Sequence, residues 1–320
     1  MFEFINWLRI LAAVLITNSH YGEIWPISAL AAGGMLGNVI FFAVSGFCLC
    51  KVKGNFPRWY LRRFLRVWPV MIAFTAFTVL IGKYPIGCVD DFVRLFVYPT
   101  NYVFLVWLLV LYVAFYPIAC GAKKNPRLPV LALGALTAVW IATYVFFVDK
   151  TAYVVDNVNS PFIMFLYFAA MLVGAIIKLN ADKLTGRKRL TAVLAVVSVA
   201  SYFATKLAVS KFEALACVQI INQFVILAAL FLIFTVFLQL EERLSRLPVR
   251  VRRVTSFLSG LTLDVYLVQF VIIKQFEAMV FPLNFLLVTA LIPVAAIILR
   301  LAELGTKQIF ARIRGEKCKS

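Results

Sequence analysis

The stretch that decides the fold is residues 4–21, which read FINWLRILAAVLITNSHY. This largely apolar segment carries Arg9 near its start and, near its end, His20, the only histidine in the chain. On one helix their spacing is about three turns plus roughly 20°, which predicts that both side chains share a face, about 16 Å apart along the axis. Two interpretations stay open. Either the pair lines a polar interior, or Arg9 snorkels to one membrane surface while His20 ends the helix at the other.

The composition around this segment predicts an all-α, polytopic integral membrane protein with about ten transmembrane helices. Of its 320 residues, 63% are hydrophobic and 14% are charged, whereas a soluble domain is about 45–50% apolar. Residues 1–320 are expected to form a single membrane domain, and the first segment lacks the basic start and cleavage site of a signal peptide. The runs long enough to span a bilayer are 4–21, 29–50, 67–84, 98–120, 129–148, 161–179, 190–208, 216–239, 256–276 and 281–300. The fourth and eighth runs are long, so tilting or breaking is expected there.

The loops between these runs alternate in charge. Basic residues follow the even-numbered runs: Lys51, Lys53, Arg58, Arg62, Arg63, Arg66, Lys123, Lys124, Arg127, Lys178, Lys183, Arg187, Lys188, Arg189, Arg243, Arg246, Arg250, Arg252, Arg253, Lys307, Arg312, Arg314, Lys317 and Lys319. The other loops hold few bases and several acids: Glu23, Asp90, Asp91, Asp149, Asp156 and Glu213. The positive-inside rule then places both termini in the cytoplasm. The net charge of +18 is therefore attributed to membrane topology and not to nucleic-acid binding.

Metal chemistry is not expected from this sequence. One histidine and scattered acids offer few ligands, and the cysteines lack metal-ligand spacing. Free thiols that act as small hydrophobes are predicted at Cys48, Cys50, Cys88, Cys120, Cys217 and Cys318.

An arginine-rich stretch, FPRWYLRRFLRVWP, occupies residues 56–69. Arg62 and Arg63 lie four and three positions before Arg66, so the three side chains share one helical face. They form either an anion clamp, since guanidinium groups bind phosphate bidentately, or an ordinary positive-inside loop. Pro69 permits a kink at the entry to the third helix.

Several polar residues lie inside apolar runs. In the second run, NVIFFAVSGFCLC at 38–50, Ser45 and Gly46 allow close approach of another helix. Asp264 either pairs with a base such as Arg9 or caps a broken helix. Amides on the eighth run either line an acceptor pocket or hold helices together, and they are Gln219, Asn222 and Gln223.

These stretches together resemble the membrane-bound acyltransferase 3 family. The resemblance rests on Arg-x10-His in the first run, FFAVSGF at 41–47 and RRFLR-x-x-P at 62–69. It is extended by FLVWLLVLYVAFYP at 104–117 and GLTLDVYLVQF at 260–270, in the order the family shows. The resemblance implies a multi-pass enzyme that moves acyl groups, often acetyl, from coenzyme A to saccharides or other acceptors at the cell envelope. The expected location is the bacterial cytoplasmic membrane.

Site residues follow from the resemblance position by position. Arg9 and His20 match the family's essential pair, which implies a catalytic role. The Arg-x-x-R motif falls on Arg63 and Arg66, which with the adjacent Arg62 are expected to bind acyl-CoA. Expected substrate-binding residues are Ser45, Tyr266, Gln269 and Asp264. Two departures stand out: many members have His at the position of Gln269, and many have a Glu where residues 107–111 are apolar here.

The chemistry of acyl transfer suits these residue types. A sugar hydroxyl becomes a competent nucleophile when a base takes its proton, and imidazole, with an ordinary pKa of about 6.5, suits that task. Acyl-CoA is expected as a co-substrate, with no permanently bound cofactor and a saccharide or glycolipid as acceptor. The rival interpretation is a transporter or flippase for a polar lipid or saccharide, which also uses intramembrane Arg and His. The oligomeric state is not predicted.

Overall fold

The computed structural model describes residues 2–313, and the side chains of residues 2–305. Arg314, Lys317, Cys318 and Lys319 lie outside the described residues. Within that range the chain is helical, with no strand. The helices are α1 (Glu3–Ser19), α2 (Gly34–Leu49), α3 (Phe56–Leu80), α4 (Val89–Phe92), α5 (Val103–Gly121), α6 (Leu128–Phe147), α7 (Ile163–Leu179), α8 (Lys188–Lys211), α9 (Ile220–Ser245), α10 (Val249–Gly260), α11 (Thr262–Phe276) and α12 (Leu283–Ile313).

Every apolar run overlaps at least one of these helices, which confirms the predicted all-α membrane fold. Seven helical stretches in the described chain are long and apolar enough to cross a bilayer, or eight if α10 and α11 count as one bent span. Two further helices, α1 and α7, have only 17 residues each, fewer than the roughly 20 that a full crossing needs. Ten spans and cytoplasmic termini therefore remain predictions.

Tilting or breaking was expected in the fourth and eighth runs, whereas the structure has a sharp bend in the ninth. Helices α10 and α11 meet at an angle of 58°, and the junction at Leu261 follows Ser259 and Gly260. A Ser-Gly pair is a common site of helix kinks. The eighth run, by contrast, belongs to the continuous 26-residue α9.

The helix predicted from residue 67 begins earlier, at Phe56. Its first turn contains Pro57, a favoured position because the missing N–H there has no intrahelical partner anyway. Arg62, Arg63 and Arg66 thus lie on the first half of α3 and not in a connecting loop.

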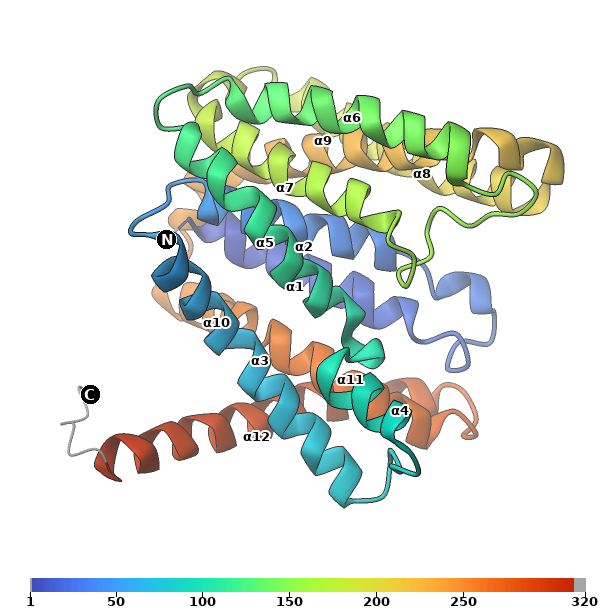
Figure 1. Ribbon diagram of the computed structural model, residues 1–320, viewed down its shortest axis with the longest axis vertical. Helices are drawn as coiled ribbons and strands as arrows, with labels where there is room; N and C mark the ends of the chain where they lie inside the picture. The colour runs from blue at the N-terminus through green and yellow to red at the C-terminus, as the bar shows by residue number, and fades with distance from the viewer. Residues whose placement is uncertain (1, 314–320) are drawn as a thin grey trace.

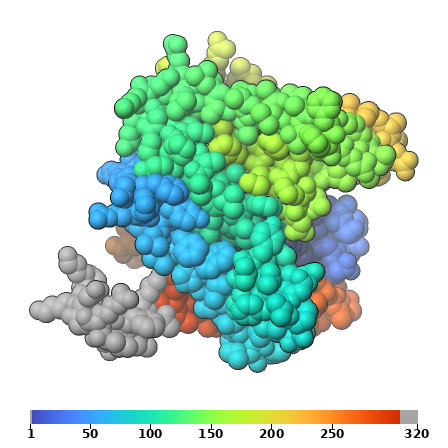
Figure 2. All heavy atoms as spheres, in the orientation of Figure 1, coloured from blue at the N-terminus to red at the C-terminus, as the bar shows by residue number. Residues whose placement is uncertain are grey.

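Figure 1 shows α6, α7, α8 and α9 at one end of the molecule, α3, α11 and α12 at the other, and α1, α2 and α5 between them. Helix α3 crosses the face shown in Figure 2. Large apolar side chains are exposed on α6 and α8, among them Phe146, Phe147 and Val196. An apolar surface of this kind suits contact with lipid.

Two glycines bring α2 and α7 into backbone contact. A Cβ on Gly46 would lie 1.9 Å from the carbonyl oxygen of Met171, and a Cβ on Gly174 would lie 1.9 Å from that of Ala43. The close approach predicted from Ser45-Gly46 is therefore present, with α7 as the partner. Packing of this kind holds membrane helices together where the hydrophobic effect cannot.

Helix α1 is fixed to α9 at its N-terminus. The backbone N–H groups of Glu3 and Phe4 donate to the carboxylate of Glu241 at 3.1 and 2.8 Å. The carboxylate satisfies two N–H groups that lack intrahelical partners, and its charge complements the helix dipole. These hydrogen bonds thereby fix the position of the N-terminus of α1, the helix that carries Arg9.

The amides of the eighth run hold a loop. Gln219 accepts from the backbone N–H of Val154 and donates to the carbonyls of Asp149 and Ala152. Gln223 donates to Val155 at 2.6 Å. Asn222 donates to the Tyr202 carbonyl on α8. Of the two interpretations left open by the sequence, these contacts favour structural support, and none of the three residues lines the cavity described next.

Candidate functional site

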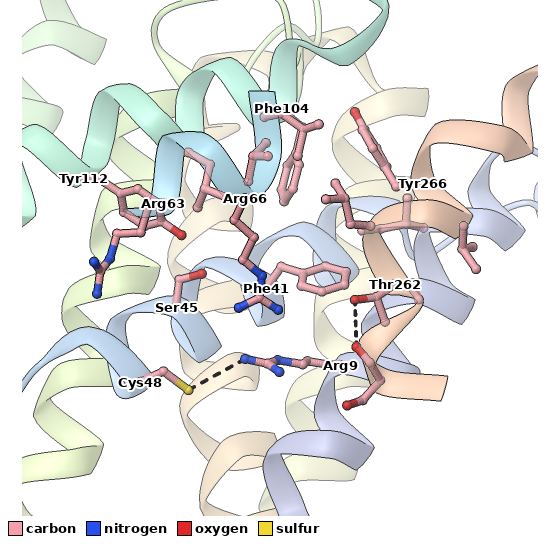
Figure 3. Close-up of a pocket in the computed structure, with 18 of the residues that line it drawn as sticks. Arg9, Phe41, Ser45, Cys48, Arg63, Arg66, Phe104, Tyr112, Thr262 and Tyr266 are labelled. Atoms are coloured by element: carbon pink, nitrogen blue, oxygen red, sulfur yellow. Dashed lines mark hydrogen bonds between the residues drawn. The ribbon is translucent and has the colours of Figure 1, made fainter. Parts of the chain in front are cut away.

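A cavity of about 380 Å³ opens among α1, α2, α3, α5, α10 and α11. Its lining includes seven residues singled out from the sequence, Arg9, Ser45, Arg62, Arg63, Arg66, Tyr266 and Gln269. These residues come from four helices and from positions up to 260 residues apart in the chain. Figure 3 shows the labelled arginines and aromatic rings around the space.

Arg9 enters the cavity from the middle of α1. Its Nη2 donates to the Sγ of Cys48 on α2 at 4.0 Å, and a thiol sulfur is only a weak acceptor. Among the described residues that line the cavity, none is acidic. Most of the hydrogen-bonding capacity of this guanidinium therefore faces the cavity. Of the two interpretations of the Arg9–His20 spacing, this supports a polar interior for Arg9.

Three of the four arginines of α3, namely Arg62, Arg63 and Arg66, line the cavity, but their guanidinium groups do not point to one place. Arg62 donates to the carbonyl of Lys53 at 3.2 Å. Arg63 lies over the ring of Trp59, with Cζ 3.9 Å from the ring centroid, and also donates to the Trp59 carbonyl. Arg66 has no hydrogen bond or ion pair with another described residue. In Figure 3 its guanidinium points toward Ser45, Phe41 and Arg9, while Arg63 turns away. The structure thus brings Arg66 together with Arg9 more closely than with Arg63.

Aromatic rings form a large part of the remaining cavity lining. Tyr266 on α11 packs against Phe104 on α5, with ring centroids 5.5 Å apart. The ring of Phe104 also packs against that of Phe41 on α2, with centroids 6.2 Å apart. Tyr112 lies beside Ser45 (Figure 3). The cavity therefore combines cationic groups with an apolar surface, which suits a ligand that has an anionic part and an uncharged chain.

Gln269 on α11 is fully buried, with 0% of its surface exposed. Its Oε1 accepts a hydrogen bond of 2.8 Å from the hydroxyl of Thr17 on α1, and its Nε2 has no hydrogen-bond partner in the described chain. Thr17 was not among the residues expected at the site. The available signal was its position one turn before His20, where it shares the helix face of the imidazole.

His20 and Asp264 are not among the residues that line the cavity. His20 caps the C-terminus of α1, and its ring packs on Phe270, with centroids 4.4 Å apart. Asp264 lies in the first turn of α11 and is 1% exposed. Thr17 is the last residue of α1 that borders the cavity, so the imidazole lies one turn beyond it.

Metal binding is not indicated by the geometry. Among the described residues, no group of three or more His, Cys, Asp or Glu side chains is placed to hold an ion. The described cysteines are free thiols, as the sequence predicted for them, while Cys318 lies outside the described residues.

Comparison with known proteins identifies the family of this domain. A family model described as an acyltransferase domain matches residues 2–301, nearly the whole chain. No curated protein and no solved structure matches significantly.

Proposed function

The chain belongs to the acyltransferase 3 family, and we propose that it transfers an acyl group, acetyl in the simplest case, from acyl-CoA to a saccharide hydroxyl. It is an integral, multi-pass membrane acyltransferase. The proposed acceptor is a cell-surface or lipid-linked saccharide, and the proposed location is the bacterial cytoplasmic membrane.

The observation that carries the proposal is the cationic cavity. Arg9 and Arg66 face a space without an acidic lining residue in the described chain, next to an apolar aromatic wall. Coenzyme A has phosphate groups that guanidinium groups bind well, followed by a long uncharged arm. A ligand of this kind fits a cavity whose lining combines guanidinium groups with aromatic and aliphatic side chains.

The proposed reaction needs a base and a stabilised oxyanion. The acceptor hydroxyl loses its proton to the imidazole of His20, and its oxygen forms a bond to the thioester carbonyl carbon. The tetrahedral intermediate then collapses with cleavage of the C–S bond. Coenzyme A leaves as a thiolate, which takes up a proton, and the acceptor carries a new oxygen ester. Hydrogen-bond donors around the carbonyl oxygen stabilise the charge that develops there.

The position of His20 suggests how the two substrates meet. Because the imidazole lies one turn beyond the cavity, we propose that acyl-CoA fills the cavity and that the acceptor approaches from the side of His20. The arrangement keeps the saccharide out of the cationic space. It also predicts that donor and acceptor affinities respond to different residues.

The test uses purified protein with radiolabelled acetyl-CoA and membranes from a strain that lacks the gene, which contain unmodified acceptor. We expect release of coenzyme A thiol and transfer of label to the saccharide or glycolipid fraction, from which mild base frees acetate. His20→Ala protein serves as the matched control. Absence of thiol release by folded wild-type protein, with saccharide or lipid still moved across vesicles, would establish the transporter instead.

A further inference from the structure

The amide of Gln269 occupies a special place in the cavity wall. It is fully buried, it borders the cavity, and its Nε2 donates to no described residue. A buried donor without an acceptor destabilises the folded state, so such groups usually have a purpose when they persist. The amide nitrogen is therefore an unsatisfied donor within the cavity wall, and a ligand oxygen pairs with it once a small movement of the wall side chains exposes it.

Thr17 determines which end of this amide is available. Its hydroxyl donates to Oε1 of Gln269 at 2.8 Å, which holds the oxygen on α1 and leaves the NH₂ group without a protein acceptor. The contact joins two helices across 252 positions of the chain. Thr17 thus orients Gln269 without needing to touch a ligand itself.

The contacts between α1 and α11 place this amide between the cavity and the imidazole. Thr17 contacts Gln269, and one turn further along α1, His20 packs on the next residue, Phe270. Along α1 the distance from Arg9 to Thr17 is about 12 Å, at 1.5 Å per residue. A donor whose phosphates lie near the arginines would extend its uncharged arm toward Gln269 and present its reactive end there.

We propose that Nε2 of Gln269 donates a hydrogen bond to the thioester carbonyl oxygen of acyl-CoA, with Thr17 as its positioning residue. This inference rests on the proposed acyl transfer. When the acceptor oxygen bonds to the carbonyl carbon, the carbonyl oxygen gains negative charge and the hydrogen bond strengthens. When the C–S bond breaks, the oxygen becomes a carbonyl again and the charge leaves with coenzyme A. A fixed donor that stabilises the oxyanion more than the bound thioester raises kcat.

The experiment measures kcat and the acyl-CoA KM for two substitutions. Gln269→Met keeps the length of the side chain and removes the donor. We expect kcat to fall about 100- to 1,000-fold, the usual effect of losing one oxyanion donor, with KM little changed. Thr17→Val keeps the shape and removes the hydroxyl, so kcat should fall about tenfold through misorientation of the amide. Thr17→Ser should restore kcat, because the hydroxyl returns.

Gln239→Met provides the matched control. Gln239 is a buried amide on α9, outside the cavity lining, whose Nε2 donates to the carbonyls of Leu184 and Gly186 at 2.7 and 2.9 Å. Its substitution should lower thermal stability and leave the kcat of folded protein unchanged. Gln269→Met should instead lower kcat and leave thermal stability near that of wild type.

Two results would overturn the inference while leaving the proposed function intact. One is a folded Gln269→Met protein with kcat within about threefold of wild type. The other is a raised KM with unchanged kcat, which would mean that the amide binds the donor in the ground state only. If wild-type protein releases no thiol, the proposed function itself fails, and the two failures are therefore distinguishable.

Discussion

His20 differs from the arginines of the site in both position and chemistry. It is the only imidazole of the chain and lies beyond the cavity, on the ring of Phe270. If it is the base, no second imidazole can take its place. His20→Ala should then abolish transfer with little change in thermal stability. His20→Gln should be equally inactive, because an amide can hydrogen-bond but cannot accept the proton.

The pH dependence adds an independent check on His20. Only the neutral imidazole can accept a proton, so wild-type activity should rise with pH through a single titration. Thiol release across pH for wild type and both variants measures this. A folded His20→Gln protein that retains more than about a tenth of wild-type kcat would refute the assignment, since such a base contributes roughly 10²–10⁴-fold.

Among the α3 arginines that line the cavity, Arg66 is the one whose guanidinium has no hydrogen bond or ion pair with a described residue. Arg66→Ala should raise the dissociation constant for acetyl-CoA, measured by calorimetry, with little effect on unfolding. Arg66→Lys should restore binding only in part, because an ammonium lacks the planar fork that matches phosphate. Arg58→Ala, on the same helix but outside the cavity lining, is the matched control. Equal affinity in wild type and Arg66→Ala would contradict the phosphate-binding role.

Residue types predicted much of this site, and three-dimensional contacts supplied the rest. An arginine in an apolar context is costly enough to indicate a function, which singled out Arg9. Arg66 was singled out because it belongs to an arginine cluster that resembles a family motif. Thr17 carries no such signal, because a hydroxyl can bond to the preceding turn of its own helix. Only the approach of α11 shows that it binds Gln269. The direction of Arg63 was also beyond prediction, since its stacking on Trp59 depends on rotamers.

Helices α2 and α7 approach each other backbone to backbone at Gly46 and Gly174, and these glycines give a prediction at the scale of elements. Gly174→Ala should destabilise the protein by about 1–3 kcal/mol, because its Cβ would meet the Ala43 carbonyl at 1.9 Å and rigid backbones cannot yield. Gly46→Ala should act similarly against Met171. Thermal unfolding in detergent measures both.

Gly134→Ala on α6 is the control for these substitutions. A Cβ there has no atom within 4 Å, and alanine favours a helix over glycine by about 1 kcal/mol. This variant should be as stable as wild type or more so. If Gly174→Ala were equally stable, α7 would not depend on backbone contact with α2.

Helices themselves were largely predictable because apolar runs of bilayer length permit few alternatives. Their ends and breaks were less so. The arginines that begin α3 read as a loop by hydropathy, yet they continue the helix because Pro57 starts it. The bend between α10 and α11 follows a short Ser-Gly sequence, which the length of an apolar run does not reveal.

At the scale of the whole molecule, the basic and the acidic loops lie on opposite sides. Figure 1 shows the N-terminus and the α5–α6 loop on the left, and the α1–α2 and α8–α9 connections on the right. Helix α8 runs from one side to the other, and its two ends differ in charge. Basic residues cluster before and at its start, including Lys183, Arg187 and Lys188, whereas its far end has Lys206, which is paired with Asp156 at 2.7 Å, and one further lysine, Lys211.

This asymmetry predicts the orientation of the protein. The basic start of α8 should face the cytoplasm, because positive loops are retained there, while a neutralised lysine gives no such bias. In a background without native cysteines, Lys183→Cys and Glu213→Cys place one thiol at each end of α8. A membrane-impermeant maleimide should label Glu213→Cys on intact cells and Lys183→Cys only after permeabilisation. The reverse pattern would invert the topology. It would also put the cationic cavity on the side away from cytoplasmic coenzyme A, so the orientation and the donor assignment are tested together.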